Sequence, residues 1–274
     1  MKTTFKIVLV FLYVTNMTGS YGQSTWRQVR PTVPIVNYNS ISFLENGTGW
    51  VSGDHATLIK TGDAGKTWER QYIFSENSLK AVSFIDDSTG WVGSSLHLIH
   101  KTTNGGNSWE PIPVNFYCES PMFFLDSMNG WVRSGANLLK TIDGGQTWEI
   151  INGDYPVFSK KLLFVDESTG WTLRGTILLK TTDGGFNWQS ASFETGLMDV
   201  YFKDVDTGWI STSSGKLFYT VNGGIAWDTI DLGTNEVLWS IHFFDDNNRL
   251  TFSNNRFYNS TDGRNPWMPH DLPQ

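Results

Sequence analysis

The octapeptide Thr141–Trp148, "TIDGGQTW", decides the fold because the chain repeats it with a fixed period. Its counterparts are "TGDAGKTW", "TTNGGNSW", "TTDGGFNW", "TVNGGIAW" and the degenerate "STDGRNPW". These six boxes end in tryptophans at positions 68, 109, 148, 188, 227 and 267, at intervals of 39 to 41 residues. A period of this length is typical of propeller blades and of some helical repeats.

A second marker, Gly-Trp, precedes five of the boxes, and a phenylalanine lies six residues before each of its glycines. In the sixth unit Arg249-Leu250 replaces Gly-Trp. Between the markers, apolar and polar residues alternate in short runs that Gly, Asn and Asp interrupt every 8 to 12 residues. Because no run is long enough for a helix, the sequence predicts an all-β propeller of four-stranded blades. Six blades are expected, with seven as the alternative.

The repeats also predict the domain organisation. Residues 23–274 should form one propeller domain, in which residues 24–29 complete the last blade as a ring-closing strand. The expected units span residues 38–76, 77–117, 118–156, 157–196, 197–235 and 236–274.

The box, written S/T-x-D/N-G-G-x-x-W, resembles the Asp-box, also called the bacterial neuraminidase repeat. Together with the Gly-Trp marker it resembles the photosystem II assembly and stability factor-like family of propellers. The resemblance covers nearly all of residues 23–274, in five good copies and one poor one. It implies the propeller fold and, by analogy with assembly factors, a protein partner.

Turn chemistry gives the box a structural role. Its Asp or Asn can accept hydrogen bonds from backbone N–H groups, its glycines permit positive φ, and its tryptophan buries a large apolar area. If Trp148 is fully buried, its replacement by alanine should cost about 3–5 kcal/mol. The predicted structural residues are Asp63, Gly65, Trp68, Asn104, Gly106, Trp109, Asp143, Gly145, Trp148, Asp183, Gly185, Trp188, Asn222, Gly224, Trp227, Asp262 and Trp267.

The net charge argues against one class of partner, and the N-terminal segment predicts where the protein is located. The 274 residues carry a formal net charge of -7, which argues against a nucleic-acid partner. Residues 1–22 read as a signal peptide, because two lysines precede the apolar run Ile7–Val14 and small residues follow it. The chain is therefore expected to be periplasmic or extracellular, with no membrane span in the mature form. Its one cysteine, Cys118, allows no disulfide within the chain.

The sequence contains no motif that supports catalysis or the binding of a cofactor or a metal. Gly65-Lys66-Thr67 lacks the upstream glycine of a phosphate-binding loop, since position 60 is Lys60. A sialidase, the enzyme with this repeat, needs three arginines that grip a carboxylate, and the sequence offers no such pattern. His97 and His100 lie three apart on an expected strand, so they should point to opposite faces and cannot share a metal ion.

Binding is therefore the expected function. Loops between blades and between the second and third strands of a blade share one face, and Tyr, Trp and Arg are good anchors there. A protein partner is the first prediction, and recognition of a carbohydrate or cell-surface polymer is the alternative. A sialidase-like glycoside hydrolase is the third and weakest option. The candidate partner face contains His55, Tyr117, Arg133, Tyr155, Arg174 and Trp239.

Overall fold

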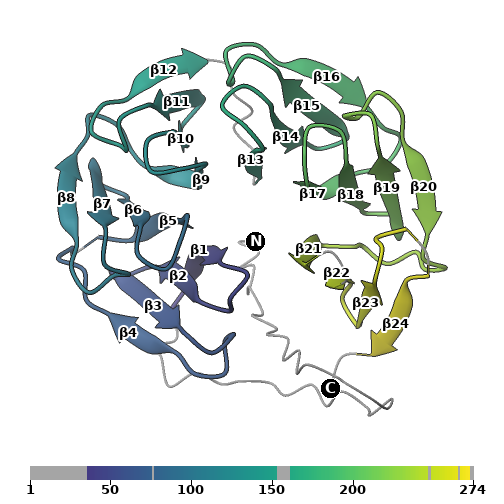
Figure 1. The fold of residues 1–274 in the computed structure, drawn as a ribbon, viewed down its shortest axis with the longest axis horizontal. Helices are drawn as coiled ribbons and strands as arrows, with labels where there is room; N and C mark the ends of the chain where they lie inside the picture. Colours follow the sequence, from purple (N-terminus) through teal and green to yellow (C-terminus); the bar gives the residue numbers. More distant parts are fainter. Residues whose placement is uncertain (1–35, 76, 153–160, 246–247, 265, 272–274) are drawn as a thin grey trace, which may run out of the picture. The chain divides into compact units, whose positions relative to one another are not determined.

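The computed structural model describes residues 36–75, 77–152, 161–245, 248–264 and 266–271. These residues form a β-propeller of six four-stranded antiparallel blades and contain no helix, as the repeats predict. In each blade the strands follow one another in sequence order (Figure 1). The described part of the chain has no helix long and apolar enough to cross a membrane. The predicted signal segment 1–22 and ring-closing strand 24–29 lie outside the described residues.

The chain divides into two compact units, and the first contains blades 1 and 2 with the first two strands and the box turn, Thr141–Thr147, of blade 3. Its strands are β1 (Tyr38–Phe43), β2 (Gly49–Gly53), β3 (Thr57–Thr61), β4 (Glu69–Gln71), β5 (Leu79–Phe84), β6 (Gly90–Ser94), β7 (Leu98–Thr102), β8 (Glu110–Pro113), β9 (Glu119–Phe124) and β10 (Gly130–Ser134).

The second unit contains the rest of blade 3 and blades 4 to 6. Its strands are β11 (Asn137–Thr141), β12 (Glu149–Asn152), β13 (Leu162–Phe164), β14 (Gly170–Arg174), β15 (Ile177–Thr181), β16 (Gln189–Ser192), β17 (Leu197–Phe202), β18 (Gly208–Thr212), β19 (Lys216–Thr220), β20 (Asp228–Asp231), β21 (Ser240–Asp245), β22 (Asn248–Phe252), β23 (Arg256–Ser260) and β24 (Met268–Asp271).

The strands differ in burial according to their place in the blade. The second strand, which carries Gly-Trp, is buried at all five positions in β2, β6 and β18. The fourth strand is mostly exposed, and β16 is exposed throughout. Apolar residues on both faces of the second strand therefore build the core between adjacent sheets, as expected for a strand covered on both sides.

Tryptophan–phenylalanine stacks join neighbouring blades. The ring of Trp50 in blade 1 lies parallel to that of Phe84 in blade 2, with 3.5 Å between centroids. Trp91 and Phe124 repeat this stack at 3.6 Å, and the Trp91 Nε1–H also donates to the Gly144 carbonyl at 2.9 Å. In the second unit, Trp171 and Phe202 stack in the same way. These contacts tie blade 1 to blade 2, blade 2 to blade 3 and blade 4 to blade 5 through one aromatic pair each.

The deepest tryptophans are those of Gly-Trp, not those of the box. Trp50, Trp91, Trp131 and Trp171 are completely buried. Trp148 is only half-buried, so the condition for a 3–5 kcal/mol loss at that position is not met. The box tryptophan instead packs edge-on against the phenylalanine of its own blade, as Trp109 does against Phe84.

The box forms a tight, self-bonded turn. In blade 3, the Thr141 hydroxyl accepts the Gly145 N–H at 2.9 Å and donates to Asp143 Oδ1 at 2.7 Å. Asp143 Oδ1 in turn accepts the Thr147 N–H at 2.9 Å. Gly144 and Gly145 have φ of 73° and 93°, a region that side chains disfavour. The first threonine of the box, which the sequence analysis did not single out, is thus a centre of the turn.

This turn predicts a specific response to acid. Burial alone would raise the pKa of Asp143, but hydrogen bonds from Thr147 and Thr141 outweigh it and lower the pKa to about 2. A carboxyl with a depressed pKa stabilises the fold above the unfolded pKa of about 4, and this contribution is lost as the pH falls towards 2. Asn222 fills the same position in blade 5 and accepts the Ala226 N–H at 2.9 Å, so a neutral amide fits the turn.

Asp143→Asn should therefore fold normally and lose less stability than the unmodified protein between neutral pH and about pH 3. The measurement is the urea midpoint of both proteins at each pH. An equal loss in the two proteins would show that this carboxylate makes no contribution to acid sensitivity.

Candidate binding site

A pocket of about 390 Å³ lies in the first unit, where the first strands of blades 1 to 3 pack side by side. We call it the Lys80 pocket. Residues of β1, β5, β9 and β10 and of the connections before β9 and after β6 line it. The lining residues are Asn39, Lys80, Ser95, Tyr117, Cys118, Glu119, Ser120 and Arg133.

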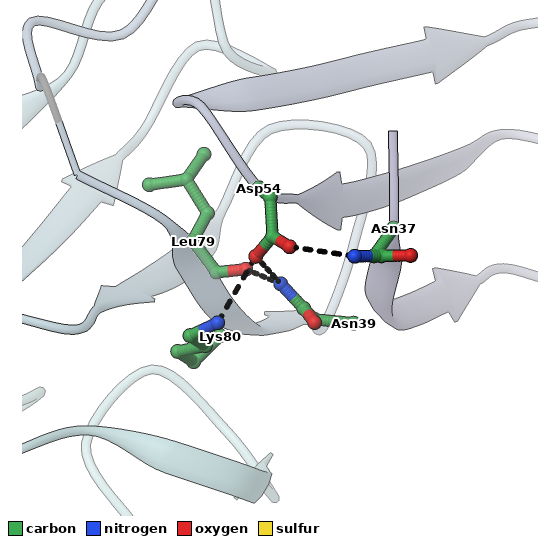
Figure 2. A network of polar contacts seen from close by, with 5 residues as sticks. All are labelled: Asn37, Asn39, Asp54, Leu79 and Lys80. Atoms are coloured by element: carbon green, nitrogen blue, oxygen red, sulfur yellow. Dashed lines mark hydrogen bonds and ion pairs between the residues drawn. The ribbon is translucent and has the colours of Figure 1, made fainter. Parts of the chain in front are cut away.

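A polar network holds Lys80 in place. Its ammonium lies 3.0 Å from Asp54 Oδ1, at the end of β2 in the neighbouring blade. Asn39 Nδ2 donates to the same carboxylate oxygen at 3.1 Å and to the Leu79 carbonyl at 2.9 Å. Asn37 Nδ2 donates to Asp54 Oδ2 at 3.1 Å (Figure 2). Asp54 is thus the common acceptor that links blade 1 to blade 2.

The environment keeps Asp54 ionised. The hydrogen bond from Asn39 holds the pKa of this carboxyl well below its usual range, and those from Lys80 and Asn37 add to the effect against the opposing influence of burial. A carboxylate that accepts several hydrogen bonds is stabilised in its charged form. Because Asp54 carries a full negative charge at neutral pH, it fixes the cationic end of Lys80 beside the pocket.

Arg133 is anchored on the opposite strand pair, β9 and β10. Its Nη2 lies 3.2 Å from Glu119 Oε2, and its Nε–H donates to the Ser120 carbonyl at 2.9 Å. The arginine side chain is largely buried, whereas that of Glu119 is more exposed. Two cationic side chains and one anionic side chain therefore line a pocket whose polar groups are already oriented.

Aromatic and thiol groups complete the wall. The Tyr117 ring is 54% exposed and packs on the His97 ring with 4.4 Å between centroids. Cys118 is buried, and burial raises the pKa of its thiol to about 12, so it stays protonated. A protonated, buried thiol is a poor nucleophile. His97 lies in the turn before β7 with φ of 48°, so the prediction that it belongs to the same strand as His100 is wrong.

The structure brings together two of the predicted face residues, Tyr117 and Arg133. His55 is exposed in the turn between β2 and β3 and is not among the pocket-lining residues. Arg174 is exposed at the end of β14, and Trp239 is 42% exposed just before β21, where its Nε1–H donates to Asn254. Tyr155 lies outside the described residues.

Sequence reasoning missed Asn39 and Lys80. Both occupy the position four residues before the marker phenylalanine of their blade, on the first strand. A polar residue at that position does not show which way its side chain points, so the sequence carries no signal that would have identified them. Among the described residues, no group of three His, Cys, Asp or Glu side chains could hold a metal ion.

Residues 19–118 match the family model described as Photosynthesis system II assembly factor YCF48. The solved structure of YCF48 bound to D1 peptide is 20% identical with a TM-score of 0.69, over 85% of this chain and 81% of that one. The chain is therefore similar to photosystem II assembly factor-like proteins over residues 19–118 and shares the β-propeller fold of YCF48. YCF48 from Cyanidioschyzon merolae matches this propeller at 19% identity and a TM-score of 0.69, over 86% of this chain and 85% of that one.

Enzymes share the same fold. The GH74 enzyme of Niastella koreensis is 16% identical to this chain, with a TM-score of 0.65 over 85% of this chain and 46% of that one. No curated protein matches the sequence. Because likeness at this level of identity speaks only for the fold, the function has to be argued from the site.

Proposed function

We propose that the chain is an exported, non-enzymatic propeller that binds a segment of a protein partner at the Lys80 pocket and acts as an interaction or assembly scaffold. The observation that carries this proposal is the meeting of Tyr117 and Arg133 with Lys80 in one pocket. Tyrosine and arginine are the residue types that dominate protein interfaces. The related YCF48 with a bound D1 peptide supports a peptide ligand for this fold.

The pocket suits a polar, extended segment. Its cations are held by Asp54 and Glu119, so little side-chain freedom is lost when a ligand binds. Lys80 and Arg133 can pair with carboxylate or carbonyl oxygens, and Glu119 can accept N–H groups. The exposed ring of Tyr117, supported by His97, offers an apolar platform beside these polar groups.

Carbohydrate recognition is the second candidate. The half-exposed ring of Tyr117 favours it, because sugars pack their apolar faces on aromatic rings in binding sites that also offer polar groups. The two cations favour a peptide instead, because their N–H donors form stronger hydrogen bonds with the carboxylates of a peptide than with the hydroxyl groups of a neutral sugar.

Selection from a peptide library and a glycan array, both with the purified protein, tests the two candidates. We expect peptides that contain an acidic residue, and we expect Tyr117→Ala and Lys80→Gln each to weaken their binding at least about tenfold. Tyr72→Ala is the matched control, because Tyr72 is 86% exposed and lies outside the pocket.

Three results would contradict the peptide proposal. Binding of glycans alone would favour the carbohydrate candidate. Equal peptide binding by Tyr117→Ala and the unmodified protein would show that the peptide does not bind at the Lys80 pocket. Hydrolysis of xyloglucan or a sialoside by the purified protein would make it an enzyme.

Export is a separate part of the proposal. It rests on the order of charge, apolar run and small residues in segment 1–22. Mass spectrometry of the protein from the periplasmic and extracellular fractions should find Gln23 as the first residue. An intact N-terminus in the cytoplasmic fraction would refute export and leave the binding proposal untouched.

A further inference from the structure

Three departures from the repeat meet at a second pocket, of about 350 Å³, in the second unit. Arg249 replaces the glycine of Gly-Trp, and Arg264 replaces the second glycine of the box. Tyr219 stands where blades 1 to 4 have a lysine, at Lys60, Lys101, Lys140 and Lys180. We call this the Arg249 pocket. In a repeat protein, shared positions serve the fold, so departures that gather in space point to a local role.

Arg249 is buried without full hydrogen bonding. It is 6% exposed, and its guanidinium lies 5.7 Å from the Trp209 ring and 5.3 Å from the Phe243 ring. Its Nη1 donates to the Thr261 carbonyl at 2.6 Å, whereas its buried Nε–H has no hydrogen-bond partner. An unpaired N–H on a buried cation is costly, so a ligand oxygen that accepts from this side chain would be favoured.

The aromatic stack has rearranged to admit this arginine. Phe243 stacks in parallel with Tyr201 at 4.1 Å and is tilted 44° from Trp209. In blades 2, 3 and 5 the equivalent phenylalanine lies flat on the tryptophan of the preceding blade, as in Trp171–Phe202. The Arg249 guanidinium therefore occupies the space beside the Trp209 ring.

Cationic side chains outnumber anionic ones by three to two at the Arg249 pocket, although the chain as a whole carries -7. Lys203 and Arg264 line it together with Arg249. The two carboxylates at the pocket, Asp204 and Asp262, already accept hydrogen bonds from backbone N–H groups of the turns in which they lie. Asp204 Oδ1 accepts the Thr207 N–H at 2.6 Å, and Asp262 Oδ1 accepts the Arg264 N–H at 2.8 Å.

We propose that the Arg249 pocket binds an oxyanion, the carboxylate or phosphate group of a small ligand. Guanidinium groups present forked N–H donors that match these anions, and the Tyr219 and Thr207 hydroxyls add further polar groups. The volume is at the lower end of the range for small-molecule sites. The site shares no residue with the Lys80 pocket, so the proposal does not depend on the peptide-binding function.

A purely structural explanation makes a different prediction. The Arg264 guanidinium lies 4.6 Å from the Tyr219 ring and donates to its hydroxyl at 2.5 Å. In the preceding pair of blades, Lys180 donates to the Gly223 carbonyl at 2.9 Å. If the three departures only exchanged one link between blades for another, no anion would bind there.

Thermal unfolding of the full chain with inorganic phosphate or acetate, at constant ionic strength set by chloride, distinguishes the two explanations. We expect the Tm to rise with at least one anion. Arg264→Gln should weaken the apparent affinity at least about tenfold. Arg70→Gln is the matched control and should respond as the unmodified protein does, because Arg70 is an exposed arginine of β4 outside both pockets.

The Arg249 Nε–H and Trp209 Nε1–H signals in ¹⁵N NMR provide a readout that needs no variant, and both should shift with the bound anion. Phosphate alone would indicate a phosphate-bearing ligand, and acetate alone a carboxylate. If neither anion moves these signals or the Tm beyond chloride, or if Arg264→Gln binds as tightly as the unmodified protein, the proposal is wrong.

Discussion

Replacement of Trp91 by alanine should lower the free energy of unfolding by about 3–5 kcal/mol. The side chain is completely buried, and its ring lies parallel to that of Phe124 in the next blade at 3.6 Å. Its Nε1–H also donates to the Gly144 carbonyl at 2.9 Å. Alanine would leave a cavity between two blades and remove a hydrogen bond that connects them. Urea denaturation of the two proteins measures the difference.

Two further tryptophans serve as controls for this result. Trp148→Ala should cost less than Trp91→Ala because Trp148 is only half-buried. Trp239→Ala, at a ring that is 42% exposed, should cost about 1 kcal/mol or less. A larger loss of stability at Trp148 than at Trp91 would show that the box tryptophan contributes more to the packing than the Gly-Trp tryptophan does.

The fold was predictable because its signals are local. A turn of Thr, Asp and two glycines specifies its own hydrogen bonds, and alternation over five or six residues specifies a strand. Repetition of both every 40 residues or so then leaves few architectures. The stack of Trp91 on Phe124 was not predictable in this way, since the two residues are far apart in sequence and lie in different blades.

The sites were only partly predictable for a related reason. Tyr117 and Arg133 could be singled out because they lie near loops of the expected face. Lys80 could not, since a polar residue on a first strand gives no sign of whether it points towards a neighbour or a pocket. In the sequence, Arg249 and Arg264 look like substitutions in a degenerate sixth repeat. Only the structure shows that the two side chains line the same pocket.

Gly90→Ala should destabilise the protein by about 1–3 kcal/mol, although alanine adds a single methyl group. A Cβ at this position would lie 2.4 Å from the Phe84 ring, which faces Gly90 across β5 and β6. The Phe84 ring cannot easily move, because Trp50 stacks on it at 3.5 Å and Trp109 packs edge-on at 6.0 Å. Overpacking against a ring held on two sides is relieved only by a shift of the blades.

Blade 6 suggests how the strain can be relieved. There the glycine is Arg249, and Phe243 has turned away from the parallel stack with Trp209. Phe84→Leu should therefore cost less in the Gly90→Ala background than in the unmodified protein, which a double-mutant cycle measures. Gly62→Ala is the matched control, because no atom lies within 4 Å of its Cβ position. Additive losses at Gly90 and Phe84 would show that their close contact does not require the glycine.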